Sequence, residues 1–180
     1  VEVKSAVTAT PADGAGLRVR LMGAGAIVRE VEAAASILER DYAVAADVWS
    51  LTSINQLQRE GKAAVRWNML HPEEEPRVPY LTRQLQGSAG PVVVATDYLK
   101  AYSDQLREFV PGRYVVLGTD GFGRSDTRSK LRQFFEVSRE YIVIAALKAL
   151  ADEGQIEAAQ VAAAMRSLGV PADKKDPFTS

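Results

Sequence analysis

The sequence predicts an α/β fold in which a mainly parallel sheet lies between two layers of helices. Short apolar runs alternate along the chain with longer segments whose apolar residues recur at helical spacing. Two runs, residues 91–96 and 114–118, are continuously apolar, which is typical of central strands covered on both faces. Strands separated by helices need crossover connections, and such connections join parallel strands.

The first part of the chain contains two predicted strands and the helix between them. Residues 17–22 alternate apolar and basic side chains, and residues 45–51 form the second strand. The apolar positions of residues 26–40 share one face of a helix. Residues 1–7 could add a further strand. The Gly-rich link that follows them is short, which favours a hairpin and therefore antiparallel pairing.

Four helix starts are predicted from side chains that can cap a helix. The capping side chains are Ser53, Asp97, Asp126 and Ser138. The helix that follows Asp97 is expected to bury Tyr98 and Leu99 on its apolar face.

The remaining segments complete a single predicted domain. Residues 67–79 contain three prolines and are expected to form an irregular connection, followed by a short helix over residues 80–86. The last helix spans residues 156–168 and is stopped by a glycine and a proline. We therefore expect one domain over residues 1–171 and a loose polar tail over residues 172–180.

Composition limits the possible functions. The 180 residues carry a formal net charge of -1, which argues against a nucleic-acid backbone as partner. No apolar window is long enough to span a bilayer, and the first residues do not resemble a signal peptide. The chain has no cysteine, which excludes thiolate catalysis and fits a reducing compartment.

A glycine-containing turn lies between the first predicted strand and its helix. Gly23 and Gly25 could bring backbone N–H groups close to a phosphate. A dinucleotide fingerprint would have a third glycine in place of Val28 and an acidic residue at the end of the second strand. Both features are missing, so we favour a turn that packs the helix closely against the strand.

The single histidine, His71, lies in the proline-rich connection next to three glutamates, residues 73–75. Nothing in the sequence forms a nucleophile elbow that could use it. We expect a solvent-facing or capping histidine and a solvated acidic turn rather than a catalytic or metal site.

The loop at residues 118–126 is the most distinctive segment of the sequence. It follows the carboxyl end of a buried strand, where ligands bind in open α/β sheets. Its aromatic and basic side chains suit a subunit contact, an anion site or a turn that caps the next helix. We favour a contact or structural role over catalysis. The candidate residues for an interface or an active-site-facing loop are Asp120, Phe122, Arg124, Ser125 and Arg128.

Six longer motifs follow one another along the chain: DVWSLTSINQL, RWNMLHPEE, RVPYLT, TDYLKAY, VLGTDGFGRSDTR and FFEVSREYIVIAALKALADEGQI. Together they resemble one enzyme family, the homodimeric pyruvate dehydrogenase component of bacteria. The resemblance covers residues 17–170, and transketolases are more distant relatives.

The resemblance implies that this chain is the last domain of a three-domain, thiamine-diphosphate-dependent parent. It implies a three-layer α/β/α domain with a five-stranded, mostly parallel sheet and one antiparallel strand. Thiamine diphosphate and magnesium would lie between the first two domains, with no catalytic, cofactor-binding or metal-binding residue here. The expected partners are the other domains, a second identical subunit and the lipoyl-bearing acetyltransferase component, in the cytoplasm.

Two alternatives remain open at this point. The chain could be a freestanding nucleotide-binding protein that uses the glycine turn and the loop at residues 118–126. It could also be an interaction module for lipoyl domains or another subunit.

Overall fold

The computed structural model of the chain describes residues 2–5 and 16–179 and contains a five-stranded mixed sheet. The spatial order of the strands is β1-β3-β2-β4-β5. The strands are β1 (Glu2–Ser5), β2 (Arg18–Gly23), β3 (Ala45–Ser50), β4 (Val92–Ala95) and β5 (Tyr114–Leu117). Strands β2 to β5 are parallel to their neighbours and β1 is antiparallel, which confirms the predicted sheet.

The pairing of β1 differs from the predicted hairpin. This strand pairs with β3, with Glu2 opposite Ser50 and Ser5 opposite Asp47. Strand β2 already has β3 on one side and β4 on the other, so it has no free edge for a hairpin partner. The antiparallel direction was predicted correctly and the partner was not. Residues 1, 6 and 7 of the expected strand lie outside the described residues.

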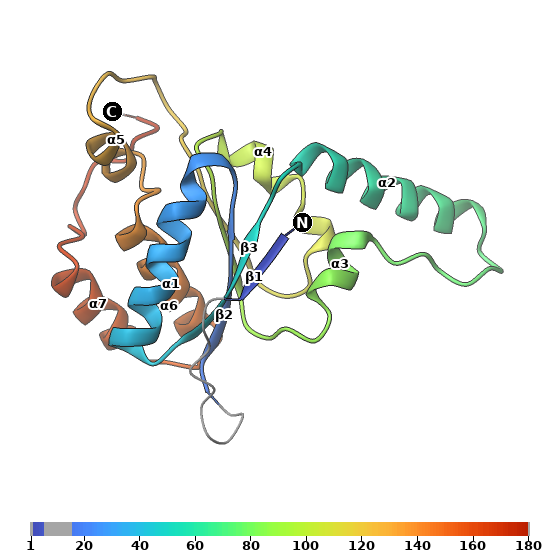
Figure 1. Cartoon of the computed structure of the whole chain (residues 1–180), viewed down its shortest axis with the longest axis horizontal. Helices are drawn as coiled ribbons and strands as arrows, with labels where there is room; N and C mark the ends of the chain where they lie inside the picture. The colour runs from blue at the N-terminus through green and yellow to red at the C-terminus, as the bar shows by residue number, and fades with distance from the viewer. Residues whose placement is uncertain (1, 6–15, 180) are drawn as a thin grey trace.

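Helices cover both faces of the sheet (Figure 1). One face carries α1 (Val28–Tyr42), α6 (Arg139–Asp152) and α7 (Ala158–Ser167). The other carries α2 (Ile54–Leu70), α3 (Tyr80–Leu85) and α4 (Lys100–Asp104). A short helix, α5 (Arg128–Phe134), and two 3-10 turns, η1 (Gly25–Ile27) and η2 (Arg107–Phe109), complete the chain.

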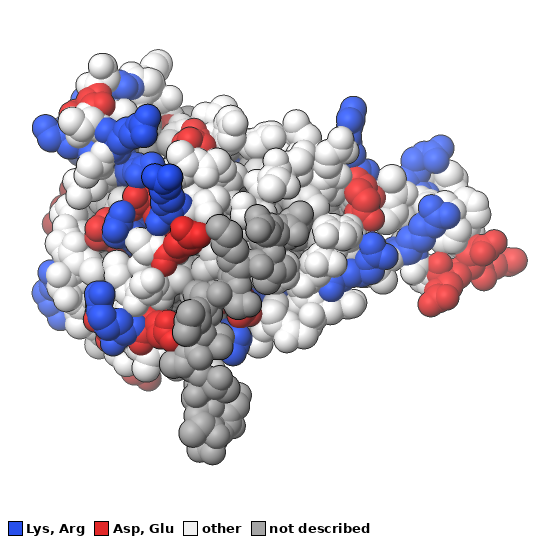
Figure 2. Space-filling view, viewed as in Figure 1, with Lys and Arg blue, Asp and Glu red and all other residues white. Residues whose placement is uncertain are grey.

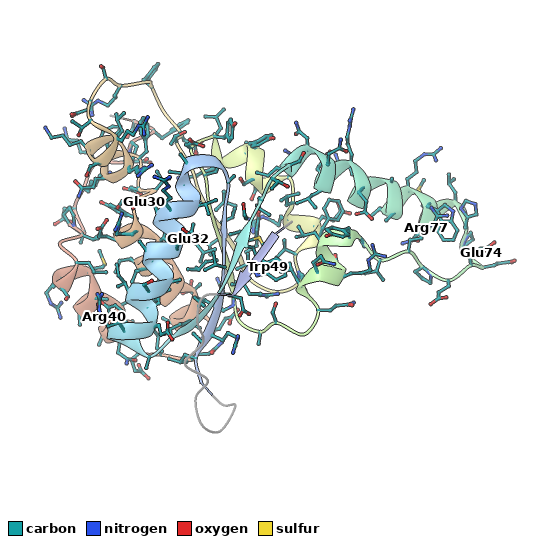
Figure 3. All side chains as sticks on the ribbon, viewed as in Figure 1. Glu30, Glu32, Arg40, Trp49, Glu74 and Arg77 are labelled. Carbon is teal, nitrogen blue, oxygen red and sulfur yellow. The ribbon has the colours of Figure 1, made fainter. Side chains whose placement is uncertain are left out.

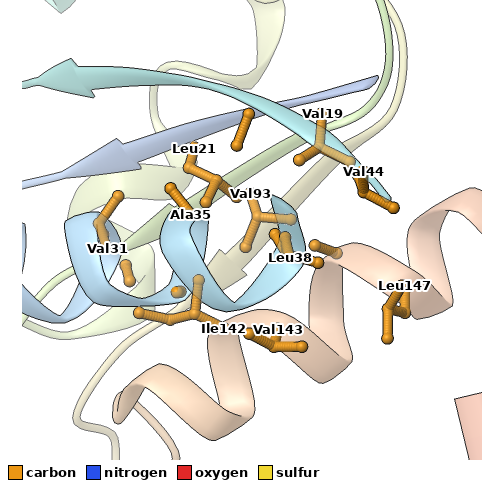
Figure 4. Packing of buried hydrophobic residues seen from close by; sticks show 14 of the residues in the cluster. Val19, Leu21, Val31, Ala35, Leu38, Val44, Val93, Ile142, Val143 and Leu147 are labelled. Atoms are coloured by element: carbon orange, nitrogen blue, oxygen red, sulfur yellow. The ribbon is translucent and has the colours of Figure 1, made fainter. Parts of the chain in front are cut away.

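The alternation of side chains along the strands produces two apolar clusters, one on each face of the sheet. Leu21 and Val93 lie in the cluster beneath α1 and α6, whereas their neighbours Met22 and Val94 lie in the opposite cluster. Figure 4 shows Val31, Ala35 and Leu38 of α1 packed toward Ile142, Val143 and Leu147 of α6. The central strands are therefore covered on both faces, as their continuous apolar runs predicted.

The helix starts confirm one of the four predicted caps. Ser53 caps α2, because its side chain accepts a hydrogen bond from Gln56 N at 3.4 Å. Thr127, and not Asp126, caps α5 by accepting from the N–H of Lys130. Ser138 occupies the expected position before α6, but its hydroxyl donates to Glu140 and caps nothing.

The prediction for Asp97 was also wrong. Helix α4 begins at Lys100, and its first N–H donates to Asp120 Oδ1 at 2.9 Å. Tyr98 and Leu99 are more than half exposed, because they lie in the connection before the helix and not on its buried face.

The carboxy-terminal tail is held against the domain, although a loose segment was expected. Lys174 Nζ donates to the carbonyl of Phe134 at 2.8 Å and pairs with Glu136 at 2.9 Å. Pro177 is buried. A lysine at this place satisfies a carbonyl that the end of α5 leaves free.

Among the described residues, no helix has the length and apolar character needed to cross a bilayer.

Candidate functional site

A cleft of about 600 Å³ opens at the carboxyl edge of the sheet. Its walls come from the connections that follow β2, β4 and β5, together with α5. The chain leaves β2 toward β3 on one side and later returns to β4 on the other, so the cleft lies where the strand order reverses. We call it the edge cleft; its lining includes Ile27, Asp97, Thr119, Arg124, Arg128 and Phe135.

The glycine turn after β2 brings α1 close to the strand. A Cβ on Gly23 would lie 2.9 Å from Val28 Cα, and Gly25 adopts a positive φ of 59°. The N–H of Ala24 donates to Ala95 O at the end of β4. The turn is thus a close packing turn, as expected, and it forms one side of the edge cleft.

The first part of the loop at residues 118–126 is fastened to the connection after β4. Thr119 N–H donates to Tyr98 O at 2.9 Å, and its hydroxyl donates to Asp97 O at 2.9 Å. Gly118 leaves room for this contact, since a Cβ there would lie 2.7 Å from Tyr98 O. Asp120 binds the first N–H of α4 and is therefore a structural residue.

The tip of the loop is exposed to solvent, but it contacts the carboxy-terminal segment and α5. Phe122 is 80% exposed, although it is a large apolar residue. Gly121 approaches the carboxy-terminal segment so closely that a Cβ would lie 2.3 Å from Pro177 O. The guanidinium of Arg124 lies 4.2 Å from the centre of the Phe134 ring, which orients it by a cation–π contact.

A buried ion-pair network holds α5 in place as a wall of the edge cleft. Glu30 of α1 is 5% exposed and accepts hydrogen bonds from Arg132 Nη1 at 2.7 Å and Arg139 Nε at 2.9 Å. It also accepts from the N–H of Arg139 at 3.1 Å, so it supplies the cap that Ser138 does not provide for α6. Figure 3 shows Glu30 on the α1 side that faces α5.

The charge of Glu30 is stabilised in this position. Burial alone raises the pKa of its carboxyl, but the hydrogen bonds and charge of Arg139, with the charge of Arg132, outweigh burial and lower it. Glu30 is therefore ionised at neutral pH and fixes both arginines. Helix α5 is thus positioned by a contact that links residues more than 100 positions apart in the chain.

The structure separates the five residues that the sequence singled out. Arg124 and Arg128 line the edge cleft, whereas Asp120 caps α4. Phe122 and Ser125 are exposed and are not part of the lining. Sequence reasoning treated Asp97 only as a helix cap, although it faces the cleft from the end of β4. Its position directly after a buried strand was the available signal.

His71 and the acidic turn at residues 73–75 lie far from this site, at the end of α2 (Figure 1). His71 is exposed and stacks on Trp67 with ring centroids 4.4 Å apart, and its backbone N–H donates to Trp67 O at the end of α2. This confirms a solvent-facing, capping histidine. We call residues 67–79, the end of α2 and the connection that follows it, the arm. Arg77 covers the Trp67 ring, and Figure 2 shows acidic residues gathered at the tip of the arm.

The ionisable groups that line the edge cleft are one carboxylate, Asp97, and three arginines, Arg124, Arg128 and Arg132. No cluster of three or more His, Cys, Asp or Glu that could hold a metal occurs among the described residues.

The comparisons with known proteins identify the family. A family model described as the transketolase-like TK C-terminal domain matches residues 7–138. The chain belongs to this family. A solved structure described as "Split gene transketolase, inactive beta4 tetramer" has the same fold, with a TM-score of 0.51 and 22% identity over 76% of this chain and 40% of that one.

Proteins with much higher identity are named pyruvate dehydrogenase E1 component. The protein from Pseudomonas aeruginosa is 52% identical over 89% of this chain, and that from Escherichia coli K12 is 48% identical over 92%. Both findings confirm the resemblance seen in the sequence. The chain spans only 18% of the length of these relatives.

Proposed function

We propose that this chain is the carboxy-terminal domain of a thiamine-diphosphate-dependent pyruvate dehydrogenase. The parent would decarboxylate pyruvate on the cofactor and acetylate a lipoyl group of the acetyltransferase component in the cytoplasm. About 50% identity along nearly the whole chain to proteins named pyruvate dehydrogenase E1 component supports this proposal. The observation that carries it is this identity combined with the family match.

We assign thiamine diphosphate and magnesium to other domains of the parent. A magnesium diphosphate needs several oxygen ligands for the metal, and the edge cleft has a single carboxylate. The residues present therefore do not fit the cofactor, and no catalytic step is assigned to them.

For the domain itself we propose a structural role that supports the dimer of the parent. The support comes from the tip of the loop at residues 118–126. An exposed phenylalanine, Phe122, lies in a loop whose base is fastened by hydrogen bonds, and two exposed arginines, Arg124 and Arg128, follow it in the sequence. Aromatic residues and arginine are enriched at protein interfaces, so this tip suits contact with a second subunit.

Replacing Phe122 with alanine in the full-length parent tests this role. We expect subunit association, measured by analytical ultracentrifugation, to weaken at least tenfold while turnover per dimer stays unchanged. Met69→Ala is the matched control, because Met69 is 70% exposed but lies on the distant arm. Intact dimers with a collapsed turnover would instead indicate an active-site loop. Unchanged association and unchanged turnover would refute a contact role.

A further inference from the structure

The edge cleft has the position and size of a ligand site. It lies at the crevice where the strand order reverses, and its volume of about 600 Å³ is within the usual range for small-molecule pockets. Its lining combines three connections that are distant in the chain, after β2, β4 and β5. The proposed function of this domain leaves the cleft without a role.

One wall of the edge cleft is basic. Among the described residues, neither Arg124 nor Arg128 forms an ion pair with a carboxylate. Arg132 beside them is already engaged by Glu30. Figure 2 shows basic side chains gathered over α5 and the loop before it. Two guanidinium groups without carboxylate partners match a dianion such as a phosphate monoester.

A second wall is apolar. Leu131 and Phe135 are partly exposed and supply this surface, whereas Ile27 and Val137 also border the cleft but are almost fully buried. This surface can cover the non-polar part of a ligand, as is typical of pockets for organic molecules and not for inorganic ions.

The opposite rim carries Asp97, and this residue decides the kind of ligand. Its carboxylate lies next to Gly25, with Oδ1 3.4 Å from the position of a Cβ there. Its backbone is held by Thr119, yet its side chain has no ion pair or hydrogen bond to the described residues. A carboxylate repels a free anion but accepts hydrogen bonds from hydroxyl groups. A ligand with its negative charge at one end and hydroxyl groups at the other suits both rims of the cleft.

We propose that the edge cleft binds a small phosphate monoester with hydroxyl groups, of the size of a nucleoside monophosphate. The phosphate lies against Arg124 and Arg128, the ring lies on the apolar wall, and the hydroxyls donate to Asp97. A dinucleotide does not fit this assignment, because the turn at Gly23–Gly25 lacks the third glycine of that fingerprint.

Adenosine 5′-monophosphate, adenosine and inorganic phosphate are suitable probes. Equilibrium dialysis is carried out on the full-length polypeptide that contains this chain, saturated beforehand with thiamine diphosphate and magnesium. We expect one saturable site per chain for the monophosphate, and at least tenfold weaker binding of adenosine and of phosphate.

Arg128→Gln is expected to weaken binding of the monophosphate at least tenfold. The matched control is Arg59→Gln, since Arg59 is an exposed arginine on α2, outside the cleft lining. Absence of saturable binding by the wild type would overturn the proposal. Equal binding by the wild type and an Arg124→Gln/Arg128→Gln double variant would overturn it as well.

Asp97→Ala separates a ligand contact from general damage, because its effects are opposite for two probes. Binding of the monophosphate should weaken at least threefold, since its hydroxyls lose an acceptor. Binding of inorganic phosphate should become tighter, since a repulsive charge is removed. A change in the same direction for both probes refutes the assignment of Asp97.

Phe122 is outside the lining of the cleft, so Phe122→Ala should leave nucleotide binding unchanged. If Phe122→Ala does not weaken dimerisation, the proposed ligand site is unaffected. If the nucleotide does not bind, the proposed dimer contact is unaffected.

Discussion

Replacing Glu30 with glutamine should destabilise the domain, because this carboxylate joins α1 to both α5 and the start of α6. It accepts four hydrogen bonds, three from the side chains of Arg132 and Arg139 and one from the backbone of Arg139. Each carboxylate oxygen of Glu30 accepts two of these hydrogen bonds. Glutamine replaces one of the two oxygens with an NH2 group, which cannot accept from the N–H groups that face it, so about two charge-assisted hydrogen bonds are lost.

The structure sets the size of the effect. Removing one partner of a fully buried ion pair costs about 3–5 kcal/mol. The side chains of Arg132 and Arg139 are 23% and 44% exposed, so both can regain contact with water. We therefore expect the free energy of unfolding to fall by about 2–3 kcal/mol at neutral pH. For a domain of this size the corresponding decrease in Tm is about 4–12 °C.

The same variant should change how stability depends on pH. The folded state lowers the pKa of Glu30, so its contribution is complete above the unfolded pKa and is lost as the pH falls through the folded value. The difference between wild type and Glu30→Gln is therefore largest at neutral pH and shrinks in acid. Urea unfolding curves, monitored by circular dichroism at several pH values from about 7 to about 3, measure this difference in the free energy of unfolding.

Glu74→Gln is the matched control, since Glu74 is exposed in the acidic turn at the end of the arm (Figure 3). Its effect should stay within about 0.5 kcal/mol. The reasoning fails if Glu30→Gln is no more destabilising than this control, or if the difference from wild type is constant with pH.

Two further substitutions test the packing of the opposite face. Gly61→Ala should destabilise the domain by about 1–3 kcal/mol despite its better helix propensity, because the new Cβ would lie 2.6 Å from the Phe109 ring. Thermal unfolding checks this, and an effect no larger than that of Lys62→Ala, at an exposed position of the same helix, would contradict it. Tyr114→Phe should cost about 1 kcal/mol in urea unfolding, because the Tyr114 hydroxyl donates to Ser103 O at 2.8 Å in the buried interior. Burial also raises the pKa of Tyr114, so a spectrophotometric titration in which it ionises at the ordinary tyrosine pKa would contradict this environment.

Local patterns were enough to predict most elements. Strand β4 was expected over residues 91–96 and spans Val92–Ala95, since a continuous apolar run bounded by turn residues has few other solutions. The Ser53 cap was also predictable, because a side chain that binds an N–H three residues later needs no information from the rest of the chain.

Caps supplied from a distance could not be predicted in this way. The first N–H of α4 is bound by Asp120, and the first N–H of α6 is bound by Glu30. These partners are 20 and 109 residues away, and only the packed fold brings them to the helix ends. The residues predicted as caps from local sequence were Asp97 and Ser138, but distant carboxylates bind these N–H groups instead.

The candidate site shows the same division. The sequence alone was sufficient to identify the family, the alternation of strands and helices, and the loop with Arg124 and Arg128 at the carboxyl end of a strand. Only the tertiary structure decided that β1 pairs with β3, that Phe122 faces solvent, and that Asp97 shares a cleft with the arginines. The reason is physical: periodicity and turn chemistry act between near neighbours, whereas strand order and cleft walls depend on which distant surfaces pack together.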